Sequence, residues 1–234
     1  IDKLRARSVL QRAGAVTVPM ATKTVQYARQ TGDPTASWHE EAAAVSATDP
    51  TFVTASLTAK TIVCRTQVTL EAMEDSPNFG EQLSAAMFGA MAAEMDRAGL
   101  HGAGASGEPD GIYGQSGVLT VAGVGTPTNY AEMLSGLKAL LDANNPLEPV
   151  NRLAIMLPRS WLTYQGLATG ISSDNTPLER PQALRGTEFL VTSNVLNTLD
   201  SPADNSTIFM GDFSSVIMGI RMNPSFKVLQ LDTY

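Results

Sequence analysis

The chain has little of what reactive or metal-binding chemistry requires. Its 234 residues include one cysteine and two histidines. The lone Cys64 cannot form an intrachain disulfide, and its place in the β-type run 61–65 predicts a small buried side chain rather than a reactive thiol. His39 lies beside Glu40 and Glu41, but neighbouring residues need a third ligand at helical or turn spacing to hold a metal. We therefore expect a solvated loop at these residues and no metal site.

Charge is also scarce. Charged residues make up 17% of the chain, below the usual share of about a quarter. The net charge is −7, and Arg5 and Arg7 are the nearest approach to a basic tract. This argues against a dedicated nucleic-acid-binding module. So few charges over this length suggest that something other than water covers much of the surface; contacts between subunits are the simplest candidate, although an enzyme surface with few charges would also fit. No apolar run of about 18 residues could cross a bilayer, so we expect no membrane contact.

Motifs of enzyme sites are missing as well. The chain has no nucleophile elbow, no Walker loop, no H-E-x-x-H and no paired-cysteine motif. We therefore expect no enzymatic activity, no cofactor, and no catalytic, cofactor-binding or metal-binding residues. Trp38 and Trp161 are expected to be packing residues. His101 follows a long helix, where a cationic ring favours the helix dipole.

The clearest feature of the sequence is this long helix, which is predicted to run from Pro77 to Leu100. Ser76 is predicted to cap it, with Pro77 at the first helical position and Gly99 and Gly102 at its end. Its apolar stripe repeats every four residues: Phe79, Leu83, Met87, Met91 and Met95. The few charges on it indicate a spine lying under a sheet, although periodicity alone equally allows the core helix of an α/β enzyme.

The glycines after the helix match G-x-G-x-x-G at Gly102, Gly104 and Gly107. A dinucleotide-binding loop needs a strand before these glycines and a helix after them, whereas here the helix comes first. The segment 108–111 predicts instead a type I turn, with Pro109 at its second position. A nucleotide-binding α/β enzyme remains the alternative of a different class, and saturable binding of NAD or ATP would support it.

The remaining pattern predicts an α+β chain with a long extended arm. Residues 23–69 suggest a hairpin with little core of its own, which is marginal unless it lies against a neighbour. A second helix is predicted at 129–141, with a capping-box-like start at Asn129 and Glu132 and a stripe of leucines. The predicted leucine stripe is Leu134, Leu137 and Leu141. Other predicted elements are strands at 15–18, 23–29, 52–69, 152–157, 188–193, 207–210, 215–221 and 226–231, a short helix at 159–164, and surface loops at 37–50 and 169–187.

Several segments occur in a characteristic order. They are Val68 to Pro77, the long helix, Asp96 to Gly104, Pro109 to Ile112, the strand-Pro-Arg-x-Trp segment Leu153 to Trp161, Leu184 to Thr187, and Gly211 to Phe213. Together they resemble the HK97-type major capsid protein family of tailed phages and prophages, over nearly the whole chain.

The resemblance implies an HK97-like capsid fold. Its parts would be an N-terminal arm at 1–22, an extended loop at 23–56, a peripheral domain at 57–127 with the spine helix 77–100, an axial domain at 128–205, and a return to the peripheral domain at 206–234. The family usually continues beyond such a return strand, so the chain is expected to stop short of its natural end.

The resemblance also implies a function. The chain would be a structural subunit that self-assembles, as pentamers and hexamers, into an icosahedral phage head around double-stranded DNA contacted non-specifically. Scaffold, portal and decoration proteins would be further partners, and assembly would occur in the bacterial host cytoplasm. An encapsulin-like protein compartment is the nearest alternative.

Some relatives cross-link a lysine of the extended loop to an asparagine. The expected tip, 42–48, has no lysine, and Lys23 and Lys60 lie at the base of the hairpin. We therefore expect no such cross-link here.

Overall fold

The computed structural model describes residues 8–36, 38, 49–69, 76–121, 125–143, 152–169, 176–199, 205–225 and 227. It contains both helices and strands, which confirms a mixed α and β chain. The chain divides into two compact units, one of Ile1–Val16 with Lys60–Met218 and one of Thr17–Ala59 with Gly219–Tyr234. Within the described residues, no helix has both the length and the apolar character needed to span a membrane.

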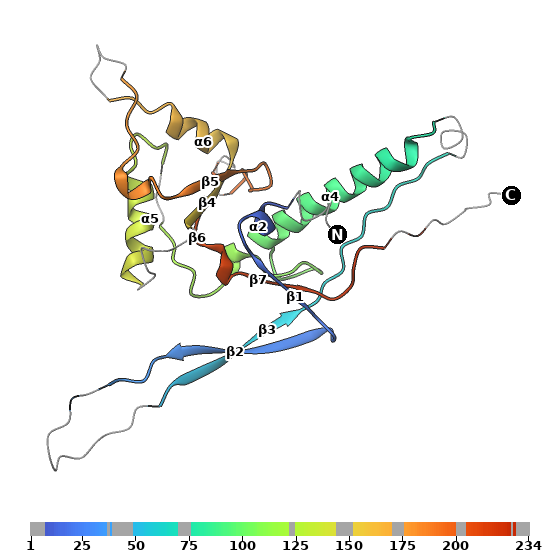
Figure 1. Ribbon diagram of the computed structural model, residues 1–234, viewed down its shortest axis with the longest axis horizontal. Coiled ribbons are helices and arrows are strands. Elements are labelled where there is room, and N and C mark those ends of the chain that lie inside the picture. The colour runs from blue at the N-terminus through green and yellow to red at the C-terminus, as the bar shows by residue number, and fades with distance from the viewer. Residues whose placement is uncertain are drawn as a thin grey trace. The chain divides into compact units, whose positions relative to one another are not determined.

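Helix α4, Phe79–His101, is the long helix of the first unit (Figure 1). The predicted start was wrong: the helix begins after Asn78, and Ser76 contributes only its carbonyl, which accepts from Phe79 N at 3.1 Å. The predicted end was right at Gly102, which is the C-cap. Gly99 does not end the helix but lies inside it. The side chain of Leu10 occupies the space that a Cβ at this position would need, which explains the glycine.

The burial of α4 differs from the predicted stripe. The five stripe residues are only half-buried, whereas the fully buried positions lie in the second half of the helix. These buried residues are Ala92, Asp96, Ala98, Leu100 and His101. The helix therefore docks on its own unit through its carboxyl-terminal half, with small and polar residues at the contact.

A three-stranded sheet lies at the centre of the first unit, in the order β5-β4-β6. Strand β4, Arg152–Met156, is parallel to β5, Glu188–Val191, and antiparallel to β6, Phe209–Asp212. Helix α6, Pro158–Gln165, follows β4 after one residue, and the short helix predicted at 159–164 is present with Pro158 added as its first residue. The strand predicted at 207–210 is displaced towards the carboxyl terminus by two residues.

The alternation of β4 separates two hydrophobic cores, because successive side chains of a strand point to opposite faces. Leu153 and Ile155 belong to a core shared with Leu10 and Leu100. Ala154 and Met156 belong to the other core. The members of that second core include Tyr130, Met133, Leu137, Tyr164, Leu167 and Leu184. Strand β4 is thus covered on both faces.

Helix α5, Ala131–Asp142, supplies part of the second core. The predicted capping box at Asn129 and Glu132 is wrong, because the N-cap residue is Tyr130, whose side chain makes no capping hydrogen bond. Asn129 lies one residue earlier, and its Oδ1 accepts from Ala131 N at 2.7 Å. The predicted stripe is only partly right. Leu137 is buried and Leu134 half-buried, but Leu141 is exposed, and Met133 is buried in its place.

The amino-terminal part of the chain contains an element that was not predicted, the short helix α2, Val9–Arg12. The strand predicted at 15–18 is present as β1, Val16–Pro19. Strand β1 pairs with β7, Ile217–Ile220. The predicted surface loop 169–187 contains a fully buried residue, Leu184, within a 3-10 turn.

The second unit contains an antiparallel hairpin of β2, Thr24–Gly32, and β3, Thr51–Thr58. Its base is closed where Ala59 N donates to Lys23 O at 2.8 Å. The strand predicted as far as Thr69 therefore ends at Thr58. The expected tip, 42–48, lies outside the described residues, as does nearly all of the strand expected at 226–231.

Candidate functional site

The described residues contain no cluster of histidine, cysteine and carboxylate side chains that could hold a metal ion. The features that could serve function are structural. One is a group of polar and aromatic contacts at the carboxyl-terminal end of α4, and the other is the exposed hairpin β2–β3. Each lies within one compact unit, and each is described separately.

The carboxylate of Asp96 is the centre of the first feature, and the residue is fully buried. Its Oδ1 accepts from Ser8 Oγ at 2.6 Å and from Leu10 N at 3.3 Å. Its Oδ2 accepts from Val9 N at 2.7 Å and from Asn194 Nδ2 at 3.2 Å. Four donors from two distant segments thus converge on one carboxylate. Hydrogen bonds to a charged group are the stronger ones, so this residue fastens both segments to α4.

Sequence reasoning missed this role of Asp96. It counted the residue as one of the few charges on the long helix. A signal was nonetheless present, because Ser8 stands directly before an apolar pair, as an N-cap residue does before a short helix. The amide groups of that first turn then bind the carboxylate, as helix N-termini do with anions.

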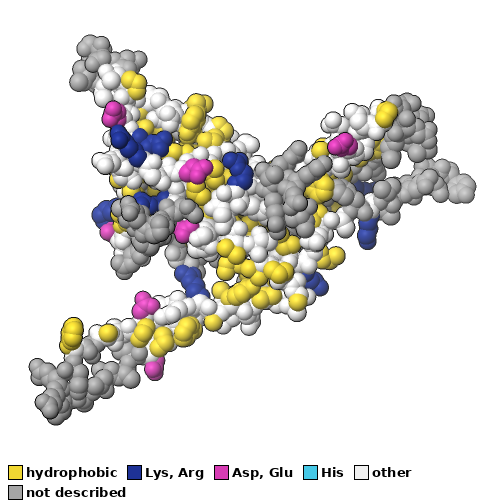
Figure 2. All heavy atoms as spheres, viewed as in Figure 1, with side chains coloured by type: hydrophobic (Ala, Val, Ile, Leu, Met, Phe, Trp, Pro, Cys, Tyr) yellow, Lys and Arg dark blue, Asp and Glu magenta, His cyan; other side chains and the backbone are white. Residues whose placement is uncertain are grey.

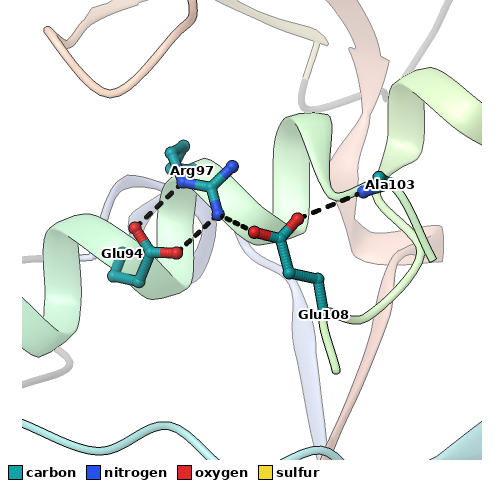
Figure 3. Close-up of polar contacts among 4 residues, drawn as sticks. All are labelled: Glu94, Arg97, Ala103 and Glu108. Carbon is teal, nitrogen blue, oxygen red and sulfur yellow. Dashed lines mark hydrogen bonds and ion pairs between the residues drawn. The ribbon is translucent and has the colours of Figure 1, made fainter. Parts of the chain in front are cut away.

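A second polar network joins α4 to the loop that follows it, as Figure 3 shows. Arg97 donates from Nε to Glu94 Oε2 at 2.9 Å and from Nη2 to Glu94 Oε1 at 2.5 Å. The same Nη2 donates to Glu108 Oε1 at 2.6 Å, while Glu108 Oε2 accepts from Ala103 N at 3.4 Å. The hydrogen bond between Arg97 and Glu94 shifts both pKa values: it lowers the pKa of Glu94 and raises the pKa of Arg97. Glu94 and Arg97 therefore stay charged near neutral pH.

The glycine loop has a different turn from the predicted one. Glu108 N donates to Ala105 O at 3.0 Å, and Ser106 and Gly107 between them have φ of 53° and 89°. The turn therefore spans 105–108, and the predicted type I turn at 108–111 is wrong. A turn with positive φ at both central positions suits a hairpin, and it explains a glycine at Gly107.

The loop then folds back on the end of α4. Gly104 N donates to Pro109 O at 3.2 Å, and Gly111 N donates to Gly102 O at 3.0 Å. A Cβ at Gly111 would lie 2.8 Å from His101 N, so only glycine allows this approach. The element after the loop, Ile112–Gly114, is a single 3-10 turn. This is not the strand–loop–helix unit of a dinucleotide site, and the glycines serve close backbone packing.

His101 packs as an aromatic ring. It is 8% exposed, and its ring centroid lies 5.4 Å from that of Tyr113 and 5.0 Å from that of Phe209. Neither ring nitrogen has a hydrogen-bond partner among the described residues. Burial lowers the pKa of His101, and the charge of Arg97 lowers it further. The ring is therefore neutral at pH 7, and the predicted cation at the helix end is wrong.

The hairpin carries apolar side chains in solvent, and Figure 2 shows them along its length. Phe52 and Val53 on β3 are 61% and 56% exposed. Val25 and Tyr27 on β2 are half-buried. A two-stranded hairpin is marginally stable by itself, and exposed apolar patches commonly mark contact surfaces. The hairpin is therefore the candidate interaction surface of the second unit.

The other residues singled out in the sequence have mixed outcomes. Trp161 packs against the second core, as predicted, but Trp38 is fully exposed, so the packing prediction for it is wrong in the single chain. Cys64 is half-buried rather than buried. Lys23 lies at the base of the hairpin, as predicted. His39 and the two glutamates beside it lie outside the described residues.

Comparison with known proteins places these features in a family. The sequence matches the Phage capsid family over residues 1–232. The capsid of an empty GTA particle computed with C5 symmetry has a similar structure, with a TM-score of 0.68, 18% identity, and coverage of 93% of this chain and 77% of that chain. No curated protein gives a significant match.

Chains from two phages are also similar in structure. Mycobacterium phage Cain gives a TM-score of 0.64 at 15% identity, covering 92% of this chain and 71% of that chain. Microbacterium phage Oxtober96 gives a TM-score of 0.62 at 17% identity, covering 92% of this chain and 73% of that chain. At these identities the likeness concerns the fold. It agrees with the family match, and together they confirm the resemblance found in the sequence.

Proposed function

Because the chain belongs to the phage capsid family and is a shell-forming structural subunit of a phage head, we propose that its hairpin β2–β3 is the surface by which it binds a neighbouring subunit. The observation that carries this is the exposure of Phe52 and Val53 on a hairpin without a core of its own. Burying such side chains against a neighbour contributes about 25 cal/mol per Å² of apolar area.

The rest of the proposed architecture is the one that the family resemblance implies. Residues 1–22 act as an amino-terminal arm and 23–56 as the extended loop. Residues 57–127 and 206–234 form a peripheral domain, and 128–205 form an axial domain around the symmetry axes. The match to GTA capsids computed with C5 symmetry supports assembly into pentamers, and hexamers complete a closed shell.

The shell encloses double-stranded DNA, with which this chain makes non-specific contact. The net charge of −7 without a basic tract supports this, since sequence-specific readers carry clustered positive charge. Scaffold, portal and decoration proteins complete the head, which assembles in the bacterial host cytoplasm. The chain is a structural protein without catalytic activity. The family match favours a phage head over an encapsulin-like compartment.

The test replaces the exposed apolar pair on β3. In Phe52→Ser/Val53→Ser we expect a soluble, folded subunit that no longer forms shells, because the contact loses its apolar area. The matched control is Thr54→Ser/Ser56→Thr on the same strand, where both residues are exposed and polar. Electron microscopy and analytical ultracentrifugation measure particle formation. Normal particles from the first variant would refute the assignment of the hairpin as the contact.

Deletion of 23–56 is the more drastic version of the same test. We expect the first unit to stay soluble, because its two cores lie in residues outside the deletion. Shells should be absent. Particles of ordinary size from the deleted chain would contradict the proposal.

A further inference from the structure

We propose that His101 is a pH-sensitive latch, whose neutral ring holds the loop 102–114 against α4 and β6 and whose protonation opens that loop. The latch is a property of the single chain, and it does not depend on the proposed contact between subunits.

The position of the ring carries the proposal. His101 is the last residue of α4, so the helix fixes its backbone, and its ring lies against Tyr113 on the loop and Phe209 on β6. It thus joins three segments at one buried point. The hydrogen bond from Gly111 N to Gly102 O closes the loop beside it. Tyr113 is itself 56% exposed, so a change that expels the imidazole removes a ring contact between the loop and α4.

The surroundings of the ring suit only its neutral form. Neither Nδ1 nor Nε2 has an acceptor among the described residues, and both atoms are buried. A protonated imidazole has two N–H donors and a positive charge, so both would be desolvated without a partner. The depressed pKa of His101 agrees with this geometry.

The charged groups around the ring do not offset the positive charge that protonation of His101 would add. On α4, one turn before the ring, Arg97 is a like charge and lowers the pKa of His101. Its partners, Glu94 and Glu108, are both engaged by its guanidinium. These two carboxylates are therefore directed to Arg97 rather than to the imidazole.

The remaining titratable groups of the packed elements lie on the loop and at the end of β6. Asp110 is exposed on the loop, and Tyr113 presents an aromatic ring to the imidazole. At the end of β6, Asp212 Oδ1 accepts from Ser214 N at 2.9 Å. The neighbouring rings can attract a cation, but the net effect of the site is a lowered pKa.

The direction of the switch follows from linkage. The opened loop exposes an ordinary histidine, with a pKa of about 6.5, whereas the closed loop has a lower one. The closed state is therefore at full stability above about pH 6.5 and loses stability as the pH falls towards the pKa of the closed state. The opening constant can rise at most about tenfold for each pH unit that separates the two pKa values.

Opening also separates an ion pair. Glu108 lies on the loop, so opening separates it from Arg97 and leaves the guanidinium with Glu94 alone. Acid thus changes the charge pattern at the end of the long helix.

The experiment combines hydrogen exchange with NMR of the full chain. The sequence has two histidines, so His39→Asn leaves His101 as the single imidazole signal. We expect it to titrate below pH 6.5. Amide protection of 102–114, corrected for intrinsic exchange, should fall between pH 7.5 and 5.0, while that of α5 stays constant. His101→Phe keeps an aromatic ring without a titrating nitrogen, and its loop should stay protected at both values.

Three outcomes would overturn the latch. One is a wild-type loop equally protected at both pH values, and another is a His101→Phe loop that opens with acid as wild type does. The third is a pKa of His101 at or above 6.5, which the NMR titration measures in the otherwise native chain. That titration decides the matter even where His101→Phe does not fold.

Discussion

Strands β4 and β3 contain similar apolar residues but have opposite environments. In β4, Leu153 to Met156 are buried, because one hydrophobic core covers each face of the strand. In β3, every residue but Leu57 is exposed, including Phe52 and Val53. β-propensity describes a side chain that fits a pleated surface, and it does not say what covers that surface. In the first unit the cover is the chain itself, and in the hairpin we propose that it is a neighbouring subunit.

The largest expected contrast is between truncations in the two strands. Ile155→Ala should destabilise the isolated subunit by about 2–5 kcal/mol, because it leaves a cavity between packed side chains. Val53→Ala should change the free energy of unfolding by less than about 0.5 kcal/mol, because the side chain is exposed. Urea unfolding of unassembled subunits measures both. Equal losses at the two sites would remove the distinction between the strands.

The next effect concerns Asp96, which fastens the amino-terminal segment to the same unit as β4. Asp96→Asn keeps the size but removes the charge and turns an NH₂ group towards donors. We expect a loss of about 2–3 kcal/mol, typical of hydrogen bonds to a charged group. The matched control is Asp142→Asn, which breaks an exposed ion pair with Lys138 and should cost at most about 1 kcal/mol. Thermal unfolding of both variants at neutral pH compares them, and a smaller loss in Asp96→Asn than in the control would contradict the role of the carboxylate.

A smaller effect is expected in the second core, which covers one face of β4. Tyr164 is buried, and its hydroxyl has no hydrogen-bond partner among the described residues. Burial, together with the nearby Glu132 and Tyr130, raises the pKa of Tyr164 to about 12. Since the pKa is higher in the folded state, this residue's contribution is complete below about pH 10 and is lost as the pH rises towards 12.

Tyr164→Phe tests this directly. At pH 8 we expect a change within about 1 kcal/mol, because the lost hydroxyl bonds nothing. Between pH 8 and 11 the variant should lose less stability than wild type, as measured by urea unfolding at each pH. Equal alkaline losses in both proteins would show that the phenol does not titrate as its burial requires.

Finally, we expect that no covalent cross-link between subunits forms through the hairpin. Lys23 lies at its base, and at about 3.3 Å per residue it is tens of ångströms from any site at the tip. Assembled particles should therefore give a single monomer band after boiling in SDS with reductant. A ladder of larger, resistant species would show that subunits are cross-linked.

Much of the candidate site could not be predicted from the sequence. The pattern placed β4, α6 and the end of α4 correctly, because apolar runs, Pro158 and Gly102 act on their own segment. The sequence pattern predicted a cationic His101, and this was wrong because an imidazole at a helix end is protonated only where water or a hydrogen-bond acceptor reaches its nitrogens. It also misplaced the glycine turn, since the hydrogen bond from Gly111 N to Gly102 O outweighs the local turn preference of Pro109.

The sequence by itself determined the family, the mixed α and β content and the existence of a hairpin, because periodicity, turn residues and segment order are local properties. Only the tertiary structure decided which of these segments are covered. Leu10 packs where a Cβ of Gly99 would lie, and Ser8 and Asn194 reach the buried Asp96 from far along the chain. Burial and hydrogen bonding depend on residues distant in sequence, and no local pattern contains them.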